Sequence, residues 1–313
     1  MRKFNAILLT YKSNKKRGKS MEIRYFMKKI KLPEDCIDYI SALYAKIKDD
    51  VEFRQITEDL EKHMPTHEIN NKLTEYSSLK KLNTFEVCLA FICSAGNIFK
   101  SRYDEKGISD DIFWDCMQDI RYKAYECKKT YGVWGISCFG WYDGYFNAYR
   151  YELGRLQFEH WSFEQESYTF GDTTIKKGDL IVNIHIPSSG PLIPEAVLDS
   201  LKRAYDFMEY KHNNKMFLIC KSWLLYPAYK NLFGENSNIR KFIDLFDIFD
   251  SVKDESFAFG YGPVFNTDKT NDISALPQDT SLQRSFVAYM KDKNADYGRG
   301  YGMIVVEDGK IIN

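Results

Sequence analysis

The stretch from Val182 to Leu192 holds the residue types best suited to chemistry in this chain. Within it, apolar residues alternate with Asn183 and His185, as in a strand with two different faces, and a Pro/Ser/Gly loop follows. An unperturbed histidine titrates near neutral pH, so His185 is a candidate general base. We therefore expect this strand end and loop to form the mouth of a binding site. The alternatives are a strand that ends in a turn and a buried histidine bonded to a backbone carbonyl.

Cys220 is a second candidate, within the strand-like segment 216–225. A cysteine that pairs with a histidine can act as a nucleophile if the pKa of its thiol is lowered. The apolar residues 217–219 favour the other interpretation, which is a buried and unreactive thiol.

A polar stripe forms the third candidate. Arg155, Gln157 and Glu159 alternate with Leu156 and Phe158, so they share one face of a predicted strand. Such a stripe can bind a polar substrate, with Glu159 as a carboxylate base. It can equally be a solvent-facing surface, because alternation alone predicts one.

Two further polar patterns favour structural roles. His63 and His67 have the spacing of metal ligands on a helix, but the proline between them disrupts that geometry, so we expect no metal site. Gln283 and Arg284 lie early in a helix that Thr280 or Ser281 caps, where structural pairing is the favoured interpretation.

The first half of the chain, from residue 33 to about 131, is predicted to be helical. Pro33 begins a segment whose apolar residues recur at helical spacing, and acids follow it in the first turn. Thr84 is expected to cap the second helix, whereas Ser109 and Gly132 are expected to bound the third.

Strands and helices interleave beyond Gly132. Three strands come first, in the segments ending near 159, at 163–170 and at 180–186. The remaining elements follow in this order: a helix from Pro194, a strand at 216–225, a helical stretch at 227–250, a strand at 257–265, a helix at 282–293 and a hairpin on Asp308-Gly309.

This order predicts an α+β fold, in which a helical N-terminal domain precedes a mixed β-sheet flanked by helices, because a doubly wound sheet would alternate from its start. We divide the chain into an extension at 1–20, a helical domain at 21–140 and a C-terminal domain at 141–313.

Composition excludes several classes of protein. Lys+Arg and Asp+Glu both number 44, so the basic excess typical of nucleic-acid binding is absent. No apolar run has the length of a membrane helix, and the basic cluster at 15–19 follows the first apolar run, the wrong order for a secretory signal. Seven cysteines without a CxxC pair predict free thiols in the reducing cytoplasm.

The sequence resembles a family of bacterial acyltransferases that combine a helical N-terminal domain with a GNAT-like C-terminal domain. The resemblance rests on stretches spread over most of the chain: Leu153-Gly154-Arg155-Leu156-Gln157-Phe158-Glu159, His185-Ile186-Pro187 with Gly190-Pro191-Leu192, Cys220-Lys221-Ser222-Trp223-Leu224-Leu225, Ser237-Asn238-Ile239, Thr280-Ser281-Leu282-Gln283-Arg284, and the glycines 298, 300 and 302.

The resemblance implies coenzyme A binding where the strand 180–186 ends. In GNAT folds, the loop after this strand and the N-terminus of the next helix hold the pyrophosphate. The implied cofactor-binding residues are Ile186, Ser188, Ser189, Gly190 and Leu192. The loop departs from the family pattern Q/R-x-x-G-x-G/A, because it holds one glycine and its three prolines remove backbone donors. The hydroxyls of Ser188 and Ser189 can supply donors in their place. The glycines near 300 lead into a strand, so they lack the helix N-terminus that a phosphate loop needs.

The implied reaction is transfer of an acyl group from acyl-CoA or acetyl-CoA to an amine, with a small-molecule substrate and no nucleic acid or membrane. His185, Glu159 and Cys220 are the catalytic candidates in that fold, where the strand of Cys220 neighbours that of His185. The substrate-binding candidates are Arg155, Gln157, Asn183, Ser222 and Trp223. Tyr226 or Tyr229 lies near the usual position of a general acid. Two alternatives stay open: a non-catalytic GNAT-like scaffold that binds a small molecule or protein, and a hydrolase that uses Cys220 with His185.

Overall fold

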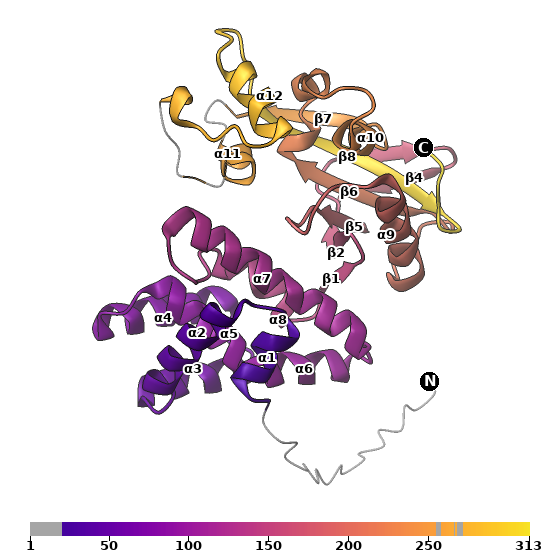
Figure 1. Ribbon diagram of the computed structural model, residues 1–313. Coiled ribbons are helices and arrows are strands. Elements are labelled where there is room, and N and C mark those ends of the chain that lie inside the picture. Colours follow the sequence, from indigo (N-terminus) through magenta and orange to yellow (C-terminus); the bar gives the residue numbers. More distant parts are fainter. Residues whose placement is uncertain (1–20, 255–257, 266, 268–271) are drawn as a thin grey trace, which may run out of the picture.

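A bundle of helices is followed by a mixed sheet in this computed structural model, which describes residues 21–254, 258–265, 267 and 272–313 (Figure 1). The bundle consists of α1 (Ile23–Lys29), α2 (Glu34–Ile47), α3 (Val51–Glu61), α4 (Thr66–Lys80), α5 (Thr84–Ser94), α6 (Gly96–Glu105), α7 (Asp110–Tyr131), the 3-10 turn η1 (Phe139–Tyr142) and α8 (Asp143–Phe146). The α+β prediction is confirmed.

Helix ends in the bundle follow local capping rules. Ser109 caps α7 through its side chain, and Gly132 ends it with a φ of 76°, as the sequence predicts. The predicted cap of α5 is wrong by one residue, since Asn83 accepts the first N–H groups and Thr84 is already helical. Helix α5 is buried along most of its length, and α7 lies on the side of the bundle that faces the sheet (Figure 1).

The main sheet has the strand order β1-β2-β5-β6-β8-β7, with β9 beside β8. Its strands are β1 (Arg150–Leu153), β2 (Leu156–Ser162), β5 (Leu180–His185), β6 (Met216–Ser222), β7 (Asp247–Lys253), β8 (Gly298–Glu307) and β9 (Lys310–Ile311). The predicted single strand near 159 is a hairpin, because Gly154 turns β1 into β2. The predicted strand at 163–170 belongs to a separate hairpin of β3 (Ser167–Phe170) and β4 (Thr173–Lys176).

Strands β5 and β6 separate at their C-terminal ends. They are the parallel pair of the sheet, and their register covers Val182 with Leu218 and Asn183 with Ile219. Beyond these pairs β5 runs on to His185 and β6 runs on to Ser222. The two strand ends therefore leave a gap in the sheet at the place where the sequence predicts a binding site.

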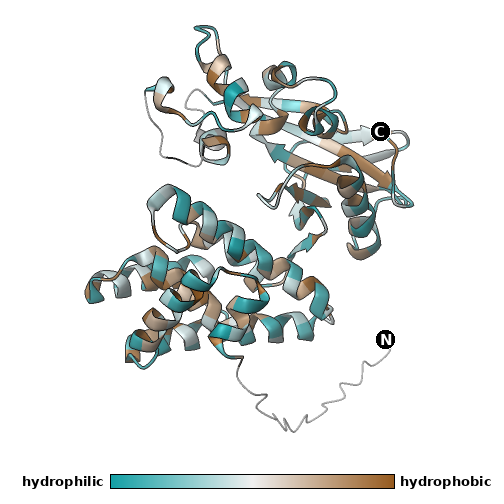
Figure 2. Cartoon of the chain, in the orientation of Figure 1, coloured by the Kyte–Doolittle hydropathy of each residue, from teal (hydrophilic) through white to brown (hydrophobic). Residues whose placement is uncertain are grey.

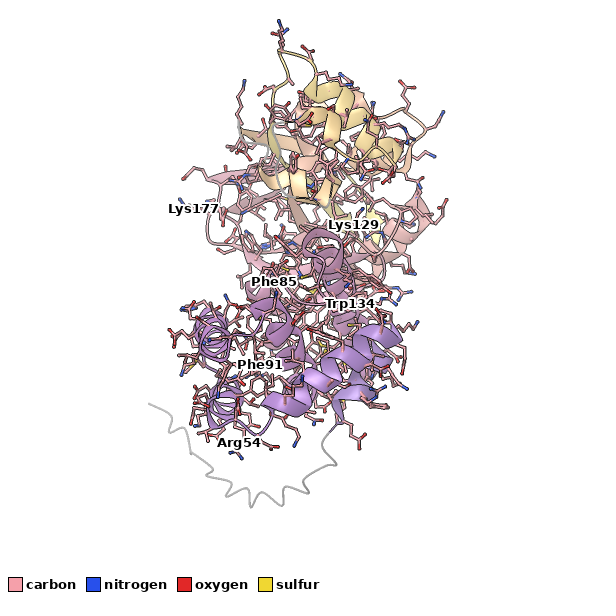
Figure 3. The ribbon with its side chains drawn as sticks, turned by 60° about the vertical axis from the view of Figure 1, so that its left-hand side comes forward. Arg54, Phe85, Phe91, Lys129, Trp134 and Lys177 are labelled. Atoms are coloured by element: carbon pink, nitrogen blue, oxygen red, sulfur yellow. The ribbon has the colours of Figure 1, made fainter. Side chains whose placement is uncertain are left out.

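Two apolar clusters cover opposite faces of this sheet. One joins Val182 and Leu218 to α9 (Pro194–Phe207) and continues into the helical bundle. The other joins Ile181 and Phe217 to the β3–β4 hairpin. Figure 2 shows hydrophobic residues on the central strands, and in Figure 3 Phe91 lies among the helices while Arg54 and Lys177 project outward. Because the first cluster spans both regions, the bundle and the sheet share a core.

Two element predictions after residue 226 are wrong. The predicted helix at 227–250 is three elements, η3 (Pro227–Leu232), α10 (Asn238–Ile243) and β7. The predicted strand at 257–265 is α11 (Ala258–Phe265), which packs on α12 (Ser281–Met290). Strand β7 is a mostly exposed edge strand that pairs with β8, so its polar sequence lacks the apolar alternation of a buried strand.

The glycines of β8 make room for a crossing segment. A methyl group at Gly300 would overlap the carbonyl oxygen of Leu225, and one at Gly298 would overlap that of Val252. Leu225 ends the 3-10 turn η2 (Trp223–Leu225), which lies against β8. These glycines lie within β8, which confirms that they belong to a strand. Among the residues described, no helix is both long and apolar enough to cross a membrane.

Candidate functional site

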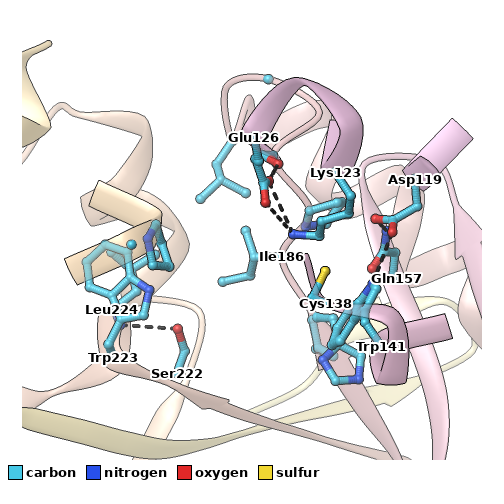
Figure 4. Close-up of a pocket in the computed structure, with 18 of the residues that line it drawn as sticks. Asp119, Lys123, Glu126, Cys138, Trp141, Gln157, Ile186, Ser222, Trp223 and Leu224 are labelled. Atoms are coloured by element: carbon cyan, nitrogen blue, oxygen red, sulfur yellow. Dashed lines mark hydrogen bonds and ion pairs between the residues drawn. The ribbon is translucent and has the colours of Figure 1, made fainter. Parts of the chain in front are cut away.

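A cavity of about 770 Å³ opens where β5 and β6 separate. The helical bundle contributes one wall, from Asp119, Lys123, Glu126, Thr130, Tyr131, Ser137, Cys138 and Trp141. The sheet and its loops contribute the other walls, from residues 155, 157, 184–188, 190–192, 220–224, 239, 262, 263, 267 and 282. Figure 4 shows the polar residues of α7 and β2 on one side of this space and Trp223 and Leu224 across it.

Most of the predicted site residues line this cavity. They are Arg155, Gln157, His185, Ile186, Ser188, Gly190, Leu192, Cys220, Ser222 and Trp223. Glu159 and Asn183 lie behind the cavity wall, against His185, and Ser189 is outside the lining set. The cavity therefore joins residues that are separated by up to 68 positions in the sequence.

One face of β1, β2 and β5 carries six polar side chains in register. Arg150 lies opposite Glu159, Glu152 opposite Gln157, Gln157 opposite His185, and Glu159 opposite Asn183. Five of these six residues are buried and His185 is partly exposed. Gln157 and Glu159 of the predicted stripe are thus not solvent-facing, because α7 and Trp141 cover them, whereas Arg155 is partly exposed.

His185 is held by a chain of ionic contacts. Its Nε2 lies 2.6 Å from Glu159 Oε2, and Glu159 Oε1 accepts a hydrogen bond from Arg150 at 2.9 Å. Burial lowers the pKa of His185 from its usual 6.5, against the opposing effect of the Glu159 carboxylate. The pKa of Glu159 is also lowered, since the contacts with His185 and Arg150 outweigh the effect of burial. Because a charged carboxylate accepts only, the short contact with Glu159 assigns the proton to Nε2 and leaves Nδ1 as the nitrogen that can act as a base. The Asn183 amide also lies 3.2 Å from Nε2.

Trp141 fixes the orientation of this histidine. The two rings meet edge to face with centroids 4.9 Å apart, and the Arg150 guanidinium stacks over the indole at 3.9 Å. The indole Nε1 donates to Asp119 Oδ2 at 3.0 Å. The imidazole is therefore packed on one side and hydrogen-bonded on another, as positioning of a base requires.

A second polar group surrounds Gln157. Its Nε2 donates to Asp119 Oδ1 at 2.9 Å and to Glu152 Oε2 at 3.2 Å. Burial raises the pKa of Glu152 to about 8 and also raises that of Asp119, so the pair is poised to hold a proton near neutral pH.

Sequence analysis did not predict the residues that the helical bundle contributes to the cavity wall. Asp119, Lys123 and Glu126 follow one another at spacings of four and three on α7, which puts them on one face of that helix. The Lys123 ammonium lies 2.9 Å from Glu126 and holds a position between the two carboxylates. This spacing was the available signal, but local pattern does not show that the face meets a sheet rather than water.

The loop at 186–193 is tied to both sides of the cavity. Arg155 donates to the carbonyl oxygens of Gly190 at 2.6 Å and Pro191 at 3.0 Å, and Ser188 donates to Glu126 on α7. Within the described part of the chain, the backbone N–H groups at 188–190 donate to no backbone or side-chain acceptor. Helix α9 begins just after this loop, with Pro194 in its first turn.

Cys220 forms part of the cavity wall on the other face of the sheet. It alternates with Ile219, so it shares a face with Leu218 and Val182, opposite to the face of His185. Its exposed fraction is 1%, and burial raises the pKa of its thiol to about 12. These features match the buried, unreactive thiol of the two interpretations and leave no activating partner.

The remaining candidates have structural contacts. Ser222 caps η2 through the N–H of Leu224, and Tyr229 accepts a hydrogen bond from Gly298 inside an aromatic cluster. Gln283 completes a capping box with Thr280, so its predicted structural pairing is confirmed. Neither Tyr226 nor Tyr229 is among the described residues that line the cavity, and no group of His, Cys, Asp or Glu there could hold a metal ion.

Comparison with known proteins divides the chain between α8 and β1, where the helical bundle ends and the sheet begins. Residues 21–148 match the N-acyltransferase N-terminal domain family, and residues 150–304 match the GNAT-like C-terminal domain family. No curated protein matches the sequence.

The fold is similar to that of solved acyltransferase structures. One, in complex with decanoyl-CoA and teicoplanin, is 19% identical with a TM-score of 0.71, over 90% of this chain and 87% of that one. Another, in complex with CoA and 10C-teicoplanin, gives the same identity, TM-score and coverage, and a third, with decanoyl-CoA alone, has a TM-score of 0.70.

Proposed function

We propose that this chain, which joins an N-acyltransferase N-terminal domain to a GNAT-like C-terminal domain, transfers an acyl group from an acyl-CoA to an amine. The observation that carries the proposal is the position of His185. It lies at the end of β5 on the wall of the cavity, with Nε2 bound by Glu159 and Nδ1 left as the base. The similar acyltransferases bind decanoyl-CoA and CoA, which supports the same class of donor here.

His185 removes the proton that the amine must lose. In the reaction, the amine nitrogen attacks the thioester carbonyl carbon, the C–S bond breaks, and coenzyme A leaves as a thiolate that takes up a proton. His185 accepts the ammonium proton at Nδ1, while Glu159 stabilises the resulting imidazolium. The edge of β5 beyond Asn183, which β6 no longer pairs, offers backbone N–H groups to the thioester oxygen.

The coenzyme A pyrophosphate is assigned to the loop at 186–192. Support comes from the unused N–H groups at 188–190 and from the N-terminus of α9 beside them, both of which favour anions. Against this, Glu126 and Glu195 place two carboxylates near the same loop. A non-catalytic scaffold is the competing function, because these carboxylates and the three prolines weaken an anion site.

The apolar side of the cavity suits the acyl chain. Ile186, Leu224, Ile239 and Leu282 line it, and the similar acyltransferases are in complex with decanoyl-CoA. We also propose a reducing, cytoplasmic setting, which the seven unpaired cysteines support. The helical region at 21–140 and the sheet region at 141–313 would then act as two domains that enclose the substrates.

Calorimetric titration with CoA and decanoyl-CoA tests this assignment. We expect micromolar binding and a raised melting temperature for the wild type, because a ligand that binds only the folded state stabilises it. Ser188→Asp should weaken binding at least tenfold by repelling the pyrophosphate. Ser251→Asp, on the exposed face of β7, is the matched control and should bind normally. If the wild type does not bind at millimolar ligand, the non-catalytic scaffold becomes the favoured function.

A further inference from the structure

Gln157 has a hydrogen-bond acceptor that no described residue uses. The side chain is fully buried and lines the cavity, and its Oε1 has no hydrogen-bond partner. Leaving a buried amide oxygen unsatisfied destabilises the folded protein. An unused acceptor in the wall of a substrate cavity therefore indicates a donor that arrives with the ligand.

The orientation of this amide is fixed by its neighbours. Both hydrogens of Nε2 are used, since they are donated to Asp119 and Glu152. Asp119 also accepts from the indole of Trp141, so it stays an acceptor. The amide nitrogen therefore faces these two carboxyl groups, and Oε1 faces away from them.

His185 lies directly beside Gln157. The two residues are cross-strand partners in the antiparallel pair of β2 and β5, so their side chains leave the same face of the sheet. Residues paired in this way have Cβ atoms about 4.5–5.5 Å apart. Since Nε2 of His185 is used by Glu159, Nδ1 is the acceptor that this ring offers. Two acceptors, one from each residue, thus lie next to each other at the cavity wall.

We propose that Oε1 of Gln157 and Nδ1 of His185 together hold the two N–H groups of a neutral primary amine, which makes Gln157 a specificity-determining residue. The inference rests on the proposed acyl transfer. A primary amine satisfies both acceptors and keeps its lone pair for the thioester carbon. A secondary amine or an alcohol has one hydrogen to donate, so Oε1 stays buried and unsatisfied when either binds. Both contacts strengthen as the nitrogen becomes positive during attack, which favours the transition state.

A comparison of two small amines tests this inference and distinguishes it from a difference in how easily an amine enters the cavity. Methoxyamine is primary and N,O-dimethylhydroxylamine is secondary, and both are uncharged at neutral pH. CoA release from decanoyl-CoA would be followed with each amine, and the rates with water alone and without enzyme would be subtracted. Relative to the uncatalysed ratio, we expect the wild type to favour methoxyamine at least about tenfold in kcat/KM.

Gln157→Met should abolish that preference, and calorimetry with decanoyl-CoA shows whether the variant still binds the donor. Gln118→Met is the matched control, because Gln118 is on α7 but bonds to Lys29, away from the cavity. Equal use of the two amines by the wild type would overturn the inference, as would a preference that survives in Gln157→Met. Failure to use methoxyamine despite decanoyl-CoA binding would also overturn it. Absence of decanoyl-CoA binding would defeat the proposed function itself.

Discussion

Burial and the Glu159 carboxylate shift the pKa of His185 in opposite directions. Burial lowers its pKa and Glu159 raises it, with the net result below 6.5. The imidazole is therefore neutral, and ready to accept a proton, throughout the neutral range. Arg150 supports this arrangement indirectly, since its ion pair keeps Glu159 charged.

Replacing Glu159 with Gln tests this balance. The lost negative charge removes the factor that raises the pKa of His185, so the acid limb of kcat/KM against pH should move to lower pH. The plateau rate should fall about ten- to a hundredfold, because the imidazolium loses its partner. A pH–rate profile of both proteins measures the two effects. An acid limb that stays in place would show that His185 is not the titrating base.

Cys220, unlike Glu159, is not expected to affect the reaction. Its thiol has a pKa of about 12 and shares no face with His185, so Cys220→Ala should keep transfer within about threefold of the wild type. The small void should lower the free energy of unfolding by only about 1 kcal/mol. Steady-state rates with a melting curve test both. Loss of turnover in a folded Cys220→Ala protein would instead support Cys220 as a nucleophile.

At the scale of elements, the loop after β5 depends on Arg155. The guanidinium holds the carbonyl groups of Gly190 and Pro191, and it comes from the turn between β1 and β2. This contact turns the loop carbonyls toward the arginine and leaves the N–H groups at 188–190 unused. The shape of the proposed anion site is thus set by a hairpin some thirty-five residues earlier in the chain.

Arg155→Met should therefore weaken acyl-CoA binding about tenfold, or about 1.4 kcal/mol, by releasing the loop. Calorimetry with decanoyl-CoA measures the change. Arg203→Met is the control, because Arg203 makes an exposed ion pair with Asp199 within α9. Unchanged affinity in Arg155→Met would place the pyrophosphate elsewhere.

The glycines of β8 allow η2 to pack closely against this strand. Gly300→Ala should lower the free energy of unfolding by about 1–3 kcal/mol, because the new methyl group overlaps the backbone of η2. Gly234→Ala has free space around it and should change stability little. Urea titrations of both variants decide the point, and equal stabilities would contradict the proposed close crossing.

The elements also show what the sequence could predict. Alternation in β2 and β5 correctly placed Gln157, Glu159, Asn183 and His185 on polar faces, because a strand repeats every two residues. It could not say whether that face was covered. The wrong predictions for β7 and α11 have the same cause. Tertiary contacts rather than local propensity make β7 an edge strand beside β8 and make α11 a helix packed on α12.

At the scale of the whole molecule, the cavity exists because two regions meet. The sheet supplies His185, the proposed base, and the loop, while α7 and η1 supply Asp119, Glu126 and Trp141. Fold alone would not distinguish an enzyme from a scaffold. Hydrogen bonds and ion pairs offset the cost of burying the polar face between the regions.

The most direct test of this account compares the wild type with His185→Asn. Both proteins would be saturated with decanoyl-CoA, and the release of CoA on adding methoxyamine would be followed over a single turnover. We predict equal affinity for decanoyl-CoA and a transfer rate about 10²–10⁴-fold lower in His185→Asn. Equal transfer rates in the two proteins would contradict the assignment of His185 as the base.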